Sequence, residues 1–198
     1  QKNGIRSLRI IAFFFFFIEG IDRACLEYEE LGVDVILKKV QGYDEETHLS
    51  AIDELKQKGC SALCLATLDT PSVAKKLNEC ESYGIKIILV NSDVKDCKRI
   101  CYVGSDYTKA GKTCAGLLSL ISRYEKLNIL VVTGSYNMLG HRMRIQGFID
   151  ELTSLKVNHE ICAQIESNDS DIQAQIRTSQ YLNEHKEINC VYVTGAGV

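Results

Sequence analysis

Short apolar runs alternate along the chain with longer segments in which apolar residues return every three or four positions. The runs are rich in Val, Ile, Leu and Cys and have few polar interruptions, which is typical of parallel strands covered on both faces. This pattern predicts eight strands, at Ser7–Phe14, Val33–Val40, Ser61–Thr67, Lys86–Ser92, Arg99–Ser105, Asn128–Thr133, Glu160–Glu166 and Asn189–Thr194.

The segments between these strands have the apolar spacing of amphipathic helices. Four buried stripes are predicted: Ile18, Ile21, Cys25, Tyr28 and Leu31; Leu49, Ile52 and Leu55; Ala110, Cys114, Leu117 and Ile121; and Ile145, Phe148, Ile149 and Leu152. Gly32, Gly59 and Gly84 each follow a helical segment and can adopt the left-handed conformation that ends a helix. Pro71 marks the start of another helix, since a first-turn position needs no N–H donor.

The alternation of strands and helices implies parallel sheets wound in the right-handed sense. Only a short link separates Lys86–Ser92 from the next strand, so the alternation breaks near the middle of the chain. We therefore expect an α/β fold of two lobes, residues 1–105 and 106–198, each a parallel sheet with helices on both faces. Because no helix follows the last strand, the second lobe is expected to be incomplete at its C-terminal end.

Composition and charge are those of an ordinary globular protein. Apolar residues make up 45% and charged residues 25% of the chain, and the net charge of −3 offers no basic footprint for nucleic acid. The nine cysteines are odd in number and are scattered through predicted helices and strands, which favours reduced thiols over disulfides or a zinc site. A reducing cytoplasm is the expected location.

Two further patterns bear on the location. The longest apolar run, from Ile10 to Ile18, is too short to cross a bilayer. No basic segment with a small-residue cleavage site precedes it, so a signal peptide is not expected.

No set of residues indicates catalysis. The segment from Gly134 to Gly140 follows a strand, but its spacing is one residue too long for a P-loop, and His141 stands where a lysine is needed. Gly195 and Gly197 form only part of a dinucleotide motif. The four histidines are isolated and are expected to be surface or capping residues. We expect neither an enzyme nor a bound cofactor or metal.

Polar residues gather where predicted strands end. They are Thr67 and Asp69, Asn91 and Asp93, Ser105 and Asp106, and the segment from Gly134 to Arg144. Each of them alone is more readily explained as a turn former or helix cap. Together they would lie at the carboxyl edges of two parallel sheets, which is where open α/β sheets bind ligands.

Several of these segments resemble one family. The segment Y-V-G-S-D-Y-T-K-A-G from Tyr102 to Gly111 is similar to the crossover motif YVGTDNxxAG of the lactose-repressor and ribose-binding-protein superfamily. The sequence I-L-V-N-S-D, which ends at Asp93, resembles the preceding VxxDxD turn of that family. Gly134 with the R-M-R-I-Q-G-F run that ends at Phe148 is similar to its G…RxxGF pattern, and the residues from Phe17 to Val33 resemble its first helix.

The resemblance implies a fold of the periplasmic-binding-protein-like I type, with a sugar held between two closing lobes. In the family the arginine before the Gly-Phe pair faces the sugar, which makes Arg144 the expected clamp. An aromatic ring can cover the C–H side of a pyranose, and Phe15, Phe16 and Phe17 occupy the matching loop. The full set of expected ligand-binding residues is Phe15, Phe16, Phe17, Thr67, Asp69, Asn91, Asp93, Asn137 and Arg144.

The function implied is the effector-binding part of a LacI-type transcription regulator, expected to be a cytoplasmic homodimer that meets DNA only through a headpiece outside this chain. The alternative is an extracytoplasmic sugar-binding protein of an ABC transporter. The chain departs from the family in an all-phenylalanine loop after the first strand, and in Gly195-Ala196 where Asn-Asp is frequent. The partner is therefore a sugar or related polyol of unspecified identity, and no membrane contact is expected.

Overall fold

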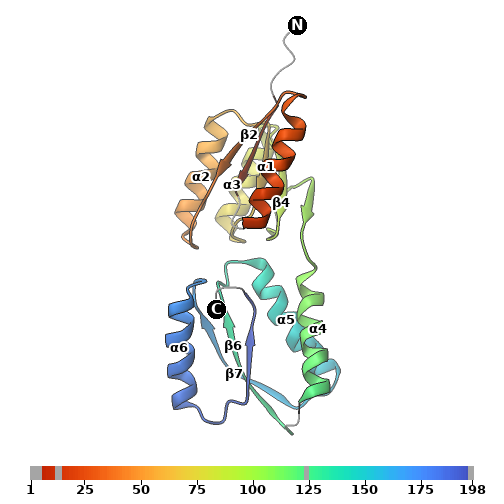
Figure 1. Cartoon of the computed structure of the whole chain (residues 1–198), viewed down its shortest axis with the longest axis vertical. Helices are drawn as coiled ribbons and strands as arrows, with labels where there is room; N and C mark the ends of the chain where they lie inside the picture. The colour runs from red at the N-terminus through yellow and green to blue at the C-terminus, as the bar shows by residue number, and fades with distance from the viewer. Residues whose placement is uncertain (1–5, 12–14, 123–124, 196–198) are drawn as a thin grey trace. The chain divides into compact units, whose positions relative to one another are not determined.

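A computed structural model describes residues 6–11, 15–122 and 125–195, which form six helices and eight strands (Figure 1). The chain divides into two compact units, Gln1–Gly104 and Ser105–Val198. Every strand pair in both units is parallel, and helices flank the sheets, so the expected α/β class is confirmed. None of the described helices is long and apolar enough to span a membrane.

The first unit is a five-stranded sheet in the order β2-β1-β3-β4-β5. Its elements are β1 (Arg6–Ile11), α1 (Phe15–Glu29), β2 (Val33–Lys38), α2 (Glu45–Gln57), β3 (Ala62–Leu65), α3 (Pro71–Ser82), β4 (Lys86–Val90) and β5 (Cys101–Val103). Alternate residues of a strand face opposite sides of the sheet. Cys64 and Ala66 therefore pack on one side with Ile21 of α1, whereas Leu63 and Leu65 are buried on the other.

The second unit is a three-stranded sheet in the order β7-β6-β8. Its elements are α4 (Tyr107–Ile121), β6 (Leu127–Thr133), α5 (Leu139–Ser154), β7 (His159–Glu166), α6 (Asp171–Glu184) and β8 (Cys190–Val193). Leu127, Ile129 and Val131 of the central strand pack with residues of α4 and α5. Helix α6 lies on the other side of this sheet (Figure 1).

Helix ends follow the local rules of the sequence. The side chains of Asp44, Thr70, Asp106 and Ser170 each accept a hydrogen bond from the backbone N–H three residues later, which satisfies a donor that the first helical turn leaves open. Gly32, Gly59 and Gly84 have φ values between 73° and 86°, as predicted for residues that end helices.

The buried face of α4 differs from the predicted one. Cys114, Leu117 and Ile121 of the expected stripe are exposed, and the helix instead buries Tyr107, Gly111 and Ala115. The physical reason is the close packing of α4 against α5. A Cβ on Gly111 would overlap the carbonyl oxygen of Arg144, and a Cβ on Gly147 would overlap that of Thr108. Small residues thus face the neighbouring helix, and large apolar ones face outward.

The start of the chain also differs. Phe15, Phe16 and Phe17 belong to the first turn of α1 rather than to a loop. The predicted strand Ser7–Phe14 is a strand from Arg6 to Ile11, and its last three residues lie outside the described residues. At the other end of α1, Leu31 is exposed because the helix ends at Glu29, which breaks the 3.6-residue period.

Candidate functional site

The first group of candidate residues lies at one edge of the five-stranded sheet. Strands β3 and β4 are parallel neighbours, with Leu65 opposite Leu89. Thr67 and Asp69 follow β3, and Asn91 and Asp93 follow β4. The topology therefore brings these four residues to the same carboxyl edge, where parallel α/β sheets bind ligands.

Thr67 is held by a buried histidine. The imidazole Nε2 of His48 lies 3.1 Å from the carbonyl oxygen of Gly42, and its Nδ1 lies 3.0 Å from the hydroxyl oxygen of Thr67. A carbonyl can only accept, so we assign the proton to Nε2, and the Thr67 hydroxyl then donates to Nδ1. His48 is 2% exposed, and burial lowers its pKa below the usual value. The expectation that His48 lies at the surface is wrong.

Asp69 and Asp93 have partners within the loop that follows β4. Asp69 Oδ1 accepts from the backbone N–H of Lys95 over 2.6 Å. Asp93 accepts from the backbone N–H of Val94 over 2.9 Å, and its other oxygen lies 2.6 Å from the guanidinium of Arg99. These contacts shape the loop, and the Arg99 guanidinium partly neutralises the Asp93 carboxylate.

Asn91 adopts a conformation that is unusual for a residue with a side chain, with φ at 60°. Strand β5 holds both of its backbone groups. The Asn91 N–H donates to the carbonyl oxygen of Val103 over 2.9 Å, and the hydroxyl of Tyr102 donates to the Asn91 carbonyl oxygen over 3.0 Å. The backbone is thus fixed on both sides at the end of β4.

The second group lies at the carboxyl edge of the three-stranded sheet. The hydroxyl of Thr194, after β8, donates to the buried hydroxyl of Thr133, at the end of β6, over 2.7 Å. Gly134 follows at a position where a Cβ would overlap the carboxylate of Asp169 from the loop after β7. This carboxylate, whose pKa is raised by burial, was not anticipated from the sequence, because nothing in the pattern ties Asp169 to Gly134.

Arg144 lies on the second turn of α5 and its guanidinium is held on two sides. It stacks on the ring of Tyr107 at 4.0 Å from the ring centroid, and it donates to the carbonyl oxygen of Thr194 over 3.0 Å. Among the described residues, Thr194 is the one hydrogen-bond acceptor of this side chain. A guanidinium has five N–H donors, so most remain available for a ligand.

The loop from β6 to α5 forms a connected polar network. Glu166 accepts from the hydroxyl of Ser135 over 2.9 Å and from the backbone N–H of Tyr136 over 2.7 Å. The N–H of Asn137 donates to the Ser135 hydroxyl over 3.2 Å, and Asn137 itself is exposed. The network fixes the backbone of this loop at the same edge as Arg144.

His141 supports the same loop from α5. It is 9% exposed, and its Nδ1 lies 3.1 Å from the backbone nitrogen and 3.0 Å from the backbone carbonyl oxygen of Ser135. Burial, with a smaller contribution from the charge on Arg144, lowers its pKa below the usual value. His141 is therefore a buried structural residue and not the surface residue that its isolation in the sequence suggested.

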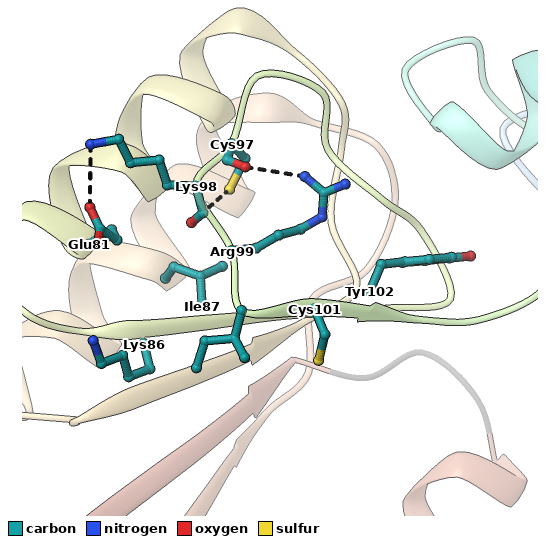
Figure 2. Close-up of a pocket in the computed structure, with 9 residues that line it drawn as sticks. Glu81, Lys86, Ile87, Cys97, Lys98, Arg99, Cys101 and Tyr102 are labelled. Carbon is teal, nitrogen blue, oxygen red and sulfur yellow. Dashed lines mark hydrogen bonds and ion pairs between the residues drawn. The ribbon is translucent and has the colours of Figure 1, made fainter.

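A surface cavity of about 580 Å³ in the first unit is lined by residues around the start of β5 and the first residues of β4 (Figure 2). Two of its three cationic side chains have partners within the protein, since Lys98 lies 3.7 Å from Glu81 and Arg99 pairs with Asp93. Among the described residues, no group of three or more His, Cys, Asp or Glu side chains is placed to hold a metal ion, and all nine cysteines are free thiols.

Comparison with solved structures shows the same architecture in sugar-binding proteins. GanP, a glucose-galactose binding protein from Geobacillus stearothermophilus, is 21% identical with a TM-score of 0.85; the match covers 98% of this chain and 70% of GanP. A solute binding protein of an ABC transporter from Burkholderia graminis, in complex with D-arabinose, is 18% identical with a TM-score of 0.81; the match covers 96% of this chain and 65% of that one.

A third similar structure is the fructose binding periplasmic domain of a hybrid two component system, 20% identical with a TM-score of 0.79 over 94% of this chain and 62% of that one. No curated protein sequence matches the chain. At these identities the three likenesses show a shared fold. The sequence model of the periplasmic binding protein domain matches residues 10–198. The chain therefore belongs to the periplasmic binding protein domain family.

Proposed function

We propose that the chain is the sugar-binding part of a sensor or carrier protein, with ligand contacts at the carboxyl edges of its two sheets. Arg144 carries the proposal. Its guanidinium is aligned by the Tyr107 ring and the Thr194 carbonyl, and most of its N–H donors remain available. The parallel N–H donors of a guanidinium can bind two adjacent hydroxyl oxygens of a sugar.

The first unit would add hydrogen-bond groups of the complementary kind. The Asn91 side chain offers an acceptor and a donor, and the Thr67 oxygen retains acceptor capacity when its proton goes to His48. Asp69, Asp93 and Asn137 remain predicted contacts. The first two, however, already have partners inside the protein, which makes them weaker candidates. The rings of Phe15, Phe16 and Phe17 remain predicted to cover the apolar side of the sugar.

For the role of the whole protein we propose effector sensing in a LacI-type regulator, cytoplasmic and dimeric, as the sequence motifs suggest. Ligand binding would then alter the relation between DNA-binding headpieces, the kind of transition by which domain closure regulates activity. The free thiols fit a reducing compartment. The similar structures named as transporter and sensor proteins support an extracytoplasmic binding protein as the second candidate.

A thermal-shift screen tests ligand class. The chain is heated with millimolar D-glucose, D-galactose, D-arabinose, D-fructose or myo-inositol, and with L-leucine as a ligand of different chemistry. A ligand at 100 times its Kd stabilises the folded state by about 2.7 kcal/mol, which raises the melting temperature by several degrees. At least one sugar or polyol should do so. A shift with L-leucine alone, or with none of the six, contradicts the proposal.

A second observation separates the two roles of the whole protein. The coding sequence upstream of the codon for Gln1 encodes a helix-turn-helix headpiece if the protein is a regulator, and a signal peptide if it is an extracytoplasmic binding protein. A signal peptide there overturns the proposed regulator and the cytoplasmic location but leaves sugar binding intact.

A further inference from the structure

The connecting segment, residues 102–107, carries the chain from the first unit to the second, and a tyrosine stands at each end of it. Tyr102 belongs to the first unit and Tyr107 to the second. Each contacts a candidate ligand-binding residue of its own unit: Tyr102 contacts Asn91, and Tyr107 contacts Arg144.

Tyr102 acts on the backbone of Asn91. Its hydroxyl donates to the Asn91 carbonyl oxygen over 3.0 Å, while the Asn91 N–H is bound by the next residue of β5, Val103. In Figure 2 the side chains of Cys101 and Tyr102 leave β5 in different directions, so that Tyr102 extends away from the charged residues of the cavity. The left-handed conformation of Asn91 is costly for a residue with a Cβ, and these two bonds offset that cost.

Tyr107 acts on the side chain of Arg144. It is 6% exposed, and its ring carries the guanidinium on one face at 4.0 Å from the centroid. A Cβ on Gly140, at the start of α5, would approach within 2.7 Å of the same ring. The glycine thus lets the ring pack closely against α5. The attraction between the cationic guanidinium and the ring face restricts where the guanidinium lies.

Each tyrosine packs beside a different glycine, whose missing Cβ leaves room for the tyrosine side chain. The Tyr102 hydroxyl occupies the place that a Cβ on Gly104 would take, and Gly104 is the last residue of the first unit. In the same way, Gly140 leaves room for the ring of Tyr107. We propose that Tyr102 and Tyr107 are positioning residues, which hold Asn91 and Arg144 in their ligand-binding conformations and so couple the connecting segment to the ligand site. The ligand-binding role of the pair rests on the proposed function.

The positioning can be measured without ligand. In the parent, NMR should show the Arg144 side-chain protons shifted upfield by the Tyr107 ring, with the resonances assigned by their loss in Arg144→Lys. In Tyr102→Phe, which removes only the hydroxyl, the Asn91 amide should exchange with solvent about three to ten times faster. Tyr83→Phe is the matched control, because Tyr83 is 74% exposed and precedes β4, at the opposite end of that strand from Asn91.

Unshifted Arg144 protons in the parent, or Asn91 exchange in Tyr102→Phe within twofold of the parent, overturn the proposal even if no sugar binds. These readouts therefore fail separately from the proposed function. They also do not depend on the folding of a Tyr107 variant.

Affinity then tests whether the tyrosines act through their partners. By calorimetry with the best binder among D-glucose, D-galactose, D-arabinose, D-fructose and myo-inositol, Tyr102→Phe should weaken binding about three- to tenfold, and Tyr107→Leu about three- to thirtyfold. Tyr107→Phe keeps the ring and should restore most of the loss. Tyr83→Phe should bind as the parent does.

Double variants test whether each tyrosine acts on affinity through its partner residue. Asn91→Gly removes the side chain while glycine adopts the left-handed conformation without strain. In this background Tyr102→Phe should change the affinity by less than about twofold, and Tyr107→Leu should likewise add little to Arg144→Ala. Fully additive losses in both pairs would show that the tyrosines act by other routes, and the proposal would be wrong.

Discussion

At the scale of single residues, three candidate ligand-binding residues are each held by a partner that is distant in the sequence. Thr67 and Asn91 follow β3 and β4, and the guanidinium of Arg144 on α5 reaches Thr194 after β8. The residues that hold these three could not be predicted from the sequence. The contacts from Tyr107, Tyr102 and His48 join residues that are 37, 11 and 19 positions apart. An isolated histidine gives no pattern that distinguishes a buried hydrogen-bonding role from exposure.

The two buried histidines predict a dependence of stability on pH. The pKa values of His48 and His141 are lowered in the folded state, so below the usual value of about 6.5 the unfolded chain binds protons that the folded chain does not. Their contribution to stability is complete above that pH and is lost as the pH falls toward the folded pKa values. Each histidine should add a slope of up to about 1.4 kcal/mol per pH unit.

Urea unfolding between pH 7.5 and 5.5 measures this slope. The double variant His48→Gln, His141→Gln keeps a donor and an acceptor at each position but does not titrate. Its unfolding free energy should fall less over this range than that of the parent. Equal pH slopes in the two proteins would show that neither histidine is held neutral by the fold.

At the scale of secondary-structure elements, the sequence predicted every strand within a few residues, since buried parallel strands leave continuous apolar runs. The prediction of which face of α4 is buried was wrong, for a physical reason. Leu117, Leu118, Leu120 and Ile121 make its C-terminal half apolar on most sides, so the period does not select a face. Close packing of Gly111 against α5 decides the orientation instead.

The packing of α4 on α5 gives a test with a control in the same helix. Gly111→Ala places a Cβ against the Arg144 carbonyl and should destabilise the protein by about 1–3 kcal/mol, the usual cost of overpacking. Gly116→Ala has nothing within 4 Å of its new Cβ and should be neutral or stabilise by up to about 1 kcal/mol, because alanine favours helix.

Chemical denaturation of both glycine variants measures the difference. The account of this interface is contradicted if Gly111→Ala is as stable as Gly116→Ala. Because α5 also carries Arg144, the substitution at Gly111 is further expected to weaken sugar binding, whereas the one at Gly116 is not.

At the scale of the whole molecule, two parallel sheets with helices on both sides followed from the alternation of elements and its break before β5. The boundary between the two compact units falls in the chain between Gly104 and Ser105. What the sequence could not supply is the identity of the ligand, because the same edge geometry accepts different arrangements of hydroxyl groups. Specificity depends on side-chain positions within an ångström, which apolar periodicity does not encode.

The central claim is that Arg144 binds a sugar, and calorimetric titration of Arg144→Ala tests it most directly. The ligand is the sugar or polyol that most raises the melting temperature of the parent. Arg23→Ala, an exposed arginine on α1, is the control and should bind as the parent does. Removing the charged guanidinium removes its hydrogen bonds to two sugar hydroxyls. The free energy of binding should weaken by about 2–3 kcal/mol, or roughly 30- to 150-fold in Kd, with little change in folding. An Arg144→Ala variant that binds within threefold of the parent would show that this arginine is not part of the ligand site.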